Sequence, residues 1–447
     1  MKILLISPVF QLGKRTPDNL TIPCLSLHIL AALTPAEHEV KIIEEEKRSL
    51  VDINEECDLV GISCYTANIR RCYELALSFK KRGIPVVLGG IHPSVLPEES
   101  IQYADAVVIG EAEKVWEGLL EDVENNTLKK MYKSDYPDLQ EYLPLTTRRP
   151  KLSQVFGVIA AETSRGCPYN CEFCSVYLHY GRKQRFKPVE HVIRDLVETG
   201  AKKVFFADDN IMGSPAYTRE LLKQLAPLKI RWAGQASIKN IHRNPDLLDL
   251  AVKSGCKLLF TGVESVSDSS INTLTKNIRN KQVIADTIKM IMDSGIMVYA
   301  GFIFGFDTDT ESVFDDTLEF VLKHKISMGS YAHVTPFPGT TLFHRLQKEG
   351  RIISTNWDDY NLSWGRVTFH PKNFSAQTLY DETQRVRLEA SKFSNALKRF
   401  STNSHNPFYY LALSYAINRE ARLITKYTNE KIAKNITIPT TFNIEYI

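Results

Sequence analysis

Three cysteines lie close together in the segment SRGCPYNCEFC, at residues 164–174. Cys167, Cys171 and Cys174 are separated by three and then by two residues. Cysteine thiolates hold iron–sulfur clusters, and three of them on one loop can bind three irons of a four-iron cluster. The fourth iron then stays open for a substrate or a cofactor. A zinc site is the alternative, but zinc usually takes four ligands, so Cys256 or His179 would have to complete it.

The segment before this loop is the first of six expected strands. Their apolar runs lie at 157–163, 202–208, 230–236, 257–264, 296–305 and 327–337. Helical patterns such as ESVFDDTLEFVLKH separate them. Six βα units over 156–345 predict an incomplete α/β barrel, in which the active site lies at the C-terminal ends of the strands. The cysteine loop would therefore lie at the mouth of the barrel.

The beginning of the chain shows a separate alternation of strands and helices. Its apolar runs, typical of buried parallel strands, lie at 2–7, 39–46, 58–63, 84–90 and 104–110. Five βα repeats over 1–125 predict a Rossmann-like domain with a ligand crevice outside the carboxyl ends of its strands. We interpret the polar stretch 126–155 as a linker and 346–447 as a helical C-terminal region. The fold class is therefore α/β.

Composition and charge restrict the possible partners. The chain has 447 residues and a net charge of +3. Its basic residues are dispersed, so we expect no nucleic-acid partner. The start, MKILLISPVF, fits a strand rather than a signal peptide, and no apolar stretch reaches the roughly 18–20 residues of a membrane span. We therefore expect a cytoplasmic protein whose eight cysteines are reduced thiols or metal ligands.

The pattern Cys-x3-Cys-x-aromatic-Cys after the first barrel strand resembles the signature of the radical S-adenosylmethionine (radical SAM) superfamily. In that family the open iron of a 4Fe-4S cluster binds the amino and carboxylate groups of SAM. Reductive cleavage then yields a 5′-deoxyadenosyl radical that abstracts a hydrogen atom. The resemblance implies an external electron donor of the flavodoxin or ferredoxin kind. The cofactor performs the chemistry, and the barrel supplies positioning and exclusion of water.

Three residues, one in the cluster motif and two at the end of the second strand, resemble the family's SAM contacts. Phe173, just before the last cysteine, resembles the aromatic residue that lies against adenine. Asp208 and Asp209 end the second strand, where the family contacts the methionyl amino group. For the aspartates, an N-cap of the next helix is the alternative interpretation.

Two later strand ends resemble further parts of the family's SAM site. Glu264, in the segment TGVES, ends the fourth strand and resembles the carboxylate that binds ribose. Gly301 and Gly305, in the segment GFIFG, resemble the glycine motif of the fifth strand. Backbone without side chains would let adenine approach closely there.

The segment HVTPFPGTTLF (333–343) resembles the sixth-strand ending of a subgroup that carries an N-terminal cobalamin-binding domain. Two loops of the first domain, GGIHPS (89–94) and VVIGEAE (107–113), resemble the characteristic loops of that domain. The resemblance implies cobalamin as a further cofactor. Its candidate contacts are Ser63, Gly89, Gly90, His92 and Gly110.

The chain departs in one respect from many cobalamin proteins. These carry the motif D-x-H-x-x-G, whose histidine ligates cobalt, and this chain has no such motif. The spacing around His92 does not match it either. Either cobalamin binds with no histidine on cobalt, or the domain has lost cobalamin and serves as a scaffold.

The favoured function is cobalamin-dependent methylation of an unactivated carbon. The alternatives are a cyclase or rearrangement enzyme without methyl transfer, a methylthiotransferase, and a non-catalytic iron–sulfur protein. A methylthiotransferase would need a second cluster on the N-terminal cysteines, which are Cys24, Cys57, Cys64 and Cys72. We expect the C-terminal region to cap the barrel mouth and to help choose a large, partly apolar small molecule. Membrane contact by a basic amphipathic helix is a less favoured alternative.

Overall fold

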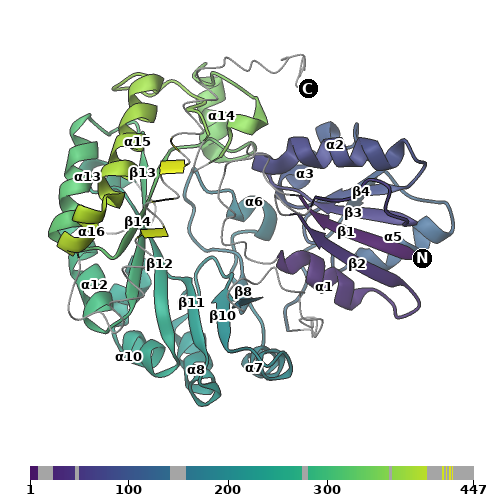
Figure 1. The fold of residues 1–447 in the computed structure, drawn as a ribbon, viewed down its shortest axis with the longest axis horizontal. Coiled ribbons are helices and arrows are strands. Elements are labelled where there is room, and N and C mark those ends of the chain that lie inside the picture. The colour runs from purple at the N-terminus through teal and green to yellow at the C-terminus, as the bar shows by residue number, and fades with distance from the viewer. Residues whose placement is uncertain are drawn as a thin grey trace.

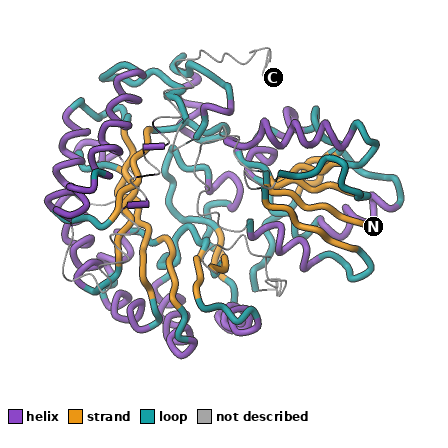
Figure 2. Tube along the Cα trace, viewed as in Figure 1, coloured by secondary structure: helices purple, strands orange, loops and turns teal. Residues whose placement is uncertain are grey.

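Two parallel sheets of six strands each organise the molecule, with loops and the short helix α6 (Val176–Tyr180) between them (Figures 1 and 2). The computed structural model describes residues 1–8, 24–45, 50–140, 158–273, 280–361 and 365–399, and six single residues from 415 to 425. Apart from those single residues, the part of the expected helical C-terminal region after residue 399 lies outside the described residues.

The N-terminal sheet has the strand order β2-β1-β3-β4-β5-β6. Its strands are β1 (Lys2–Ser7), β2 (Glu39–Glu44), β3 (Leu59–Ser63), β4 (Val86–Gly89), β5 (Ala106–Ile109) and β6 (Met131–Lys133). The helices around it are α1 (Leu25–Leu33), η1 (Thr66–Asn68), α2 (Ile69–Lys80), α3 (Ile91–Val95), α4 (Pro97–Ser100) and α5 (Trp116–Glu124). Alternate residues of β1 belong to separate apolar clusters on the two faces, so both faces of the sheet are buried. Strand β6 pairs with β5 and lies within the segment expected to be a linker.

The second sheet has the order β14-β13-β12-β11-β10-β7, so each new strand adds beside the previous one. Its strands are β7 (Val158–Ala161), β10 (Lys203–Phe206), β11 (Arg231–Gln235), β12 (Cys256–Glu264), β13 (Met297–Phe304) and β14 (Met328–His333). A small antiparallel pair, β8 (Ser164–Arg165) and β9 (Arg185–Phe186), lies beside it. All six strands are parallel, as the predicted partial (βα)6 barrel requires.

Helices surround this barrel, and most of them cover its outer face (Figure 1). They are α7 (Val189–Glu198), α8 (Pro215–Leu225), η2 (Ala226–Leu228), α9 (Ile238–Arg243), α10 (Asp246–Lys253), α11 (Asp268–Thr273), α12 (Lys281–Asp293), α13 (Ser312–Lys323) and α14 (Thr341–Lys348). Their apolar faces and the strands share one large core. None of the described helices is both long and apolar enough to cross a membrane.

The region after α14 contains η3 (Trp357–Asp359), α15 (Ala376–Ser391) and α16 (Phe393–Arg399). Helix α15 packs against β14 and α13, and its Leu379, Val386 and Ala390 belong to the barrel core. This helix therefore extends the outer helical layer and does not cap the barrel mouth, so a cap from other parts of the C-terminal region stays a prediction. Segment η3 lies instead against α2 and η1 of the N-terminal part.

Candidate active site

The cysteine loop begins shortly after β7 ends. Cys171 is buried, whereas Cys167 and Cys174 are half-buried. Gly166 precedes the loop with a φ of 86°, and a Cβ there would lie 2.7 Å from the carbonyl oxygen of Lys183. Only glycine fits a position that is both left-handed and crowded by backbone. The chain can therefore turn sharply into the first cysteine.

The environment of the thiols suits an iron cluster. Burial and the nearby Cys171, Asp209 and Cys167 raise the pKa of the Cys174 thiol to about 12. Neighbouring buried thiols resist ionisation, whereas a bound metal cation favours their thiolate form. The chemistry of the three donors therefore fits an iron–sulfur cluster.

The two residues considered as a fourth zinc ligand lie elsewhere. Cys256 is the first residue of β12, so it lies at the amino end of the barrel, away from the strand ends that lead into the site. His179 approaches the N-terminal part, with 3.4 Å between its Nδ1 and Ser94 Oγ. Within the described ranges, no three His, Cys, Asp or Glu side chains form a site for a single metal ion.

The two aspartates that follow β10 have different environments. The carboxylate of Asp208 is buried and accepts hydrogen bonds from the amide of Thr163 at 3.0 Å and from its hydroxyl at 2.6 Å. Burial raises the pKa of Asp208 to about 6. Asp209 accepts a hydrogen bond from the amide of Gly166, and its pKa rises to about 7 because of burial and the neighbouring Asp208. Asp208 thus anchors the start of the cysteine loop, and Asp209 lies close to the thiols.

Two buried polar groups that the sequence analysis missed lie next to these aspartates. Neither the amide nitrogen of Asn210 nor the hydroxyl of Ser237 has a hydrogen-bond partner among the described residues. The backbone amide of Ser237 donates to Asn210 Oδ1 at 3.1 Å, so the two residues are neighbours. Buried groups of this kind need an explanation, such as a bound ligand or water. The signal in the sequence was the place of Asn210 directly after the two aspartates.

Glu264 ends β12 in an uncommon conformation. Its φ is 66°, and the pairing of β12 with β13 is irregular between Gly262 and Glu264. A left-handed backbone is unfavourable for a residue with a Cβ, and such strain is concentrated at functional sites. The strain and the position at the barrel mouth agree with the expected ligand contact.

The two glycines expected on the adenine side are needed for packing within the protein. A Cβ on Gly301 would lie 3.0 Å from the ring of Phe260. Gly305 has a φ of 102°, and a Cβ there would lie 2.6 Å from Leu379 of α15. Both glycines therefore permit a close approach by the chain's own side chains, which accounts for them without a ligand.

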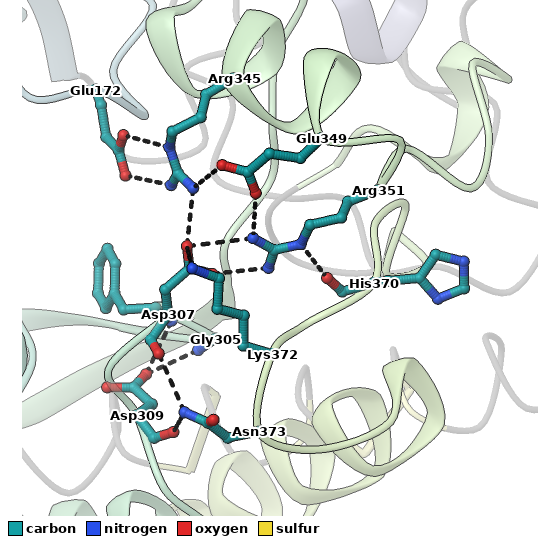
Figure 3. A network of polar contacts seen from close by, with 11 residues as sticks. Glu172, Gly305, Asp307, Asp309, Arg345, Glu349, Arg351, His370, Lys372 and Asn373 are labelled. Carbon is teal, nitrogen blue, oxygen red and sulfur yellow. Dashed lines mark hydrogen bonds and ion pairs between the residues drawn. The ribbon is translucent and has the colours of Figure 1, made fainter.

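Two residues of the cysteine loop contact elements from later in the chain. The ring of Phe173 packs against Phe306, with 5.9 Å between the ring centres. The carboxylate of Glu172 accepts two hydrogen bonds from Arg345 of α14 (Figure 3). The loop is thus supported from the direction of β13 and α14.

The expected cobalamin contacts lie at the carboxyl edge of the N-terminal sheet. Ser63 ends β3, Gly89 ends β4, and Gly110 follows β5, so the fold brings these three together. Gly89 is half-exposed, and a Cβ there would meet nothing closer than 3.9 Å. Gly90 differs, because its φ is 104° and a Cβ would lie 2.5 Å from the carbonyl oxygen of Cys64. The turn itself therefore requires Gly90.

His92 has protein partners at both ring nitrogens. It is only 1% exposed, with Nδ1 at 3.1 Å from Thr66 Oγ1 and Nε2 at 3.4 Å from Glu99 Oε1. The Glu99 carboxylate also accepts a hydrogen bond from the indole of Trp357 at 3.0 Å. His92 therefore supports the docking of η3, and its nitrogens are not directed at a cofactor.

A buried network of ion pairs joins a loop of the N-terminal sheet to the start of the cysteine loop of the barrel. Arg165, two residues before Cys167, pairs with Glu111 and Glu113 of the GEAE loop and with Glu162. Arg185 of β9 also pairs with Glu111. The loop expected to face cobalamin thus uses both its glutamates to contact the barrel.

Two family models match the chain: the radical SAM superfamily over residues 161–321 and the B12 binding domain over residues 19–120. Bacteriochlorophyllide d C-8(2)-methyltransferase of Chlorobaculum tepidum is 32% identical over 358 residues, which cover 75% of this chain and 79% of that protein. The chain belongs to the radical SAM superfamily. The two matched domains are those expected for a 4Fe-4S cluster with SAM and for cobalamin.

Two further comparisons cover nearly the whole of this radical SAM protein. Bacteriochlorophyllide d C-12(1)-methyltransferase of Chlorobaculum tepidum is 28% identical over 444 residues, 95% of this chain and 94% of that protein. The solved structure of the methyltransferase TsrM from Kitasatospora setae superposes with a TM-score of 0.67 and 13% identity, over 97% of this chain and 99% of that one. The predicted fold class and the prediction of a radical SAM enzyme of the cobalamin-dependent methyltransferase class are confirmed.

Proposed function

We propose that this enzyme methylates an unactivated carbon of a large, partly apolar small molecule, with its cluster held by Cys167, Cys171 and Cys174. One observation carries the proposal. The loop with these cysteines leaves the barrel beside the carboxyl edge of the B12-type sheet, to which Arg165 and Glu111 connect it. The two cofactor sites would therefore be neighbours, as methyl transfer to a substrate radical requires.

When bound, the cluster and SAM supply one-electron cleavage, and cobalamin supplies the methyl group. The residues of the chain bind and orient these groups. Asp209 would accept hydrogen bonds from the amino group of SAM, and the unpaired donors of Asn210 and Ser237 suit its carboxylate. Glu264 would accept the ribose hydroxyls, and Phe173 would pack against adenine.

For cobalamin we propose the edge formed by Ser63, Gly89 and Gly110, where two glycines leave the backbone accessible. Both nitrogens of His92 have partners, which supports binding without a histidine on cobalt.

The substrate and the electron donor are inferred from chemistry. Two relatives are named for bacteriochlorophyllide d, which supports a large, partly apolar substrate here. An external flavodoxin- or ferredoxin-like protein would supply the electron for SAM cleavage. Reduced thiols and an iron–sulfur cluster suit the reducing cytoplasm.

Anaerobic reconstitution tests the proposal. The protein should bind about four irons, show cobalamin absorbance, and cleave SAM to 5′-deoxyadenosine under reduction. Its product should gain one methylene unit in mass. Cys171→Ala should lose both the iron and SAM cleavage. SAM cleavage by a variant with all three cysteines changed to alanine would refute the cluster assignment, and a product without added methyl would favour the cyclase or rearrangement alternative.

A further inference from the structure

Glu172 lies inside the cysteine motif, between Cys171 and Phe173, and is held by helix α14. Arg345 donates from Nε to one carboxylate oxygen of Glu172 at 3.1 Å and from its terminal nitrogen to the other at 2.9 Å. The carbonyl of Glu172 also accepts a hydrogen bond from the amide of Leu342 at 2.9 Å. The first turns of α14 are thus fixed to the cysteine loop through both backbone and side chain.

Asp307 is the second anchor of Arg345 (Figure 3). Arg345 donates to Asp307 Oδ2 at 2.8 Å, and Arg351 donates to the two oxygens of the same carboxylate at 2.7 and 3.2 Å. Lys372 Nζ lies 3.4 Å from Asp307 Oδ2. Asp307 belongs to the loop after β13, while Arg351 and Lys372 come from the segment after α14. One carboxylate therefore connects that segment to the arginine that holds the cysteine loop.

The loop that carries Asp307 is itself fixed. The Asp309 carboxylate accepts hydrogen bonds from the amides of Gly305 and Phe306 at 2.9 and 3.0 Å. The side-chain amide of Asn373 donates to the carbonyls of Asp307 and Asp309 at 3.0 and 2.7 Å. This loop can therefore act as a rigid support rather than as a mobile cover.

We infer that Arg345 is a positioning residue that transmits the position of Arg351 and Lys372, through Asp307, to the cysteine loop. The inference rests on the proposed cluster and gives the C-terminal region a role in the geometry of the three thiolates. A two-point arginine–carboxylate contact fixes orientation as well as distance. A lysine carries the same charge without the planar fork and cannot replace that contact.

The test compares full-length, anaerobically reconstituted variants. Arg345→Met should release iron to a chelator about tenfold faster than wild type, because it removes several charge-assisted hydrogen bonds. It should also alter the electron paramagnetic resonance spectrum of the reduced cluster. Arg345→Lys should change both the rate of iron release and the spectrum by less. Arg219→Met is the matched control, since Arg219 makes a similar two-point contact with Asp246 at 2.7 and 3.1 Å on the outer helices.

The thermal unfolding midpoints of the same samples distinguish an effect on the position of the cysteine loop from a general loss of stability. Iron release and spectra that are the same for Arg345→Met, Arg219→Met and wild type would overturn the inference. If Arg345→Met does not fold, Glu172→Gln, which keeps the shape of the side chain, gives the same comparison. Failure of the cluster assignment, on which the inference rests, is a separate result, because wild type itself would then bind no cluster.

Discussion

Glu264 adopts a left-handed backbone conformation at the carboxyl end of β12, where glycine would be more stable. The conformation costs a residue with a Cβ roughly 1–2 kcal/mol. Beside it, the pairing of β12 with β13 becomes irregular, so the strand end departs from regular sheet geometry. The position of this carboxylate at the barrel mouth keeps the ribose contact of Glu264 as a prediction.

We predict that Glu264→Gly and Glu264→Ala both weaken SAM binding, by about tenfold or more for the lost charge-assisted hydrogen bonds. The two variants should differ in stability, since glycine relieves the strained φ and alanine keeps it. The glycine variant should therefore be more stable than the alanine variant by about 1 kcal/mol. Equilibrium binding of SAM and thermal unfolding measure the two effects. Unchanged SAM affinity in both variants would remove Glu264 from the site.

How much of the site can be predicted depends on the range of the interactions involved. The spacing of Cys167, Cys171 and Cys174 is local, so the cluster motif is readable from sequence alone. Asp208 and Asp209 look equivalent in sequence. In the structure, however, Asp208 accepts hydrogen bonds from Thr163, whereas Asp209 lies near the thiols. Both residues follow β10 in a loop, where no strand period applies, and the folded partners decide which of them reaches the site.

At the scale of elements, long buried strands can be predicted from the sequence, whereas strands of two or three residues cannot. Inner strands of the N-terminal sheet, such as β1 and β3, are buried on both faces, so their sequences are nearly continuous apolar runs. Strands β6, β8 and β9 have only two or three residues each, too few for any period to show. Gly305 resembles a ligand-binding glycine in sequence, but its neighbour in space is Leu379 of α15. No local pattern reveals such a partner.

Asp307, in the loop after β13, should make the stability of the fold depend on pH in the acidic range. Partial burial raises the pKa of Asp307, but hydrogen bonds and charges from Arg351 and Arg345 outweigh burial and lower that pKa to about 2. Because the pKa is lower in the folded state, the contribution is complete above about pH 4 and is lost as the pH falls through 2, a change of about 2 kcal/mol. Asp307→Asn removes this contribution. The gap in thermal unfolding midpoint between cluster-free wild type and the variant should therefore narrow from pH 6 to pH 2, and a constant gap would contradict the prediction.

At the scale of the whole molecule, the two sheets are joined on two sides of the proposed cofactor region. Arg165 connects the cysteine loop to the GEAE loop, and Trp357 connects the segment after α14 to Glu99 of the N-terminal part. The sequence suggested cofactor contacts for the loops that carry His92 and Glu111. Glu111 and Glu113 instead bind Arg165 across the interface, and His92 contacts Thr66 and Glu99 within the N-terminal part. Contacts between distant segments leave no periodic signal in the sequence. We therefore expect buried polar contacts between the two parts to set the distance between the proposed cofactor edges.

This arrangement predicts that Glu111→Gln uncouples SAM cleavage from methylation. Glutamine keeps the size of the side chain but removes the charge that pairs with Arg165 and Arg185. Breaking a buried ion pair costs about 3 kcal/mol or more, so the cysteine loop becomes free to shift relative to the N-terminal sheet. Since a misplacement of about 1 Å can slow a reaction on the order of 100-fold, methylated product per 5′-deoxyadenosine should fall at least about tenfold, with iron and cobalamin contents unchanged. Asp246→Asn, which breaks an exposed pair with Arg219, is the control. Equal product ratios in wild type and Glu111→Gln would mean that the network stabilises the fold without setting the distance between the cofactors.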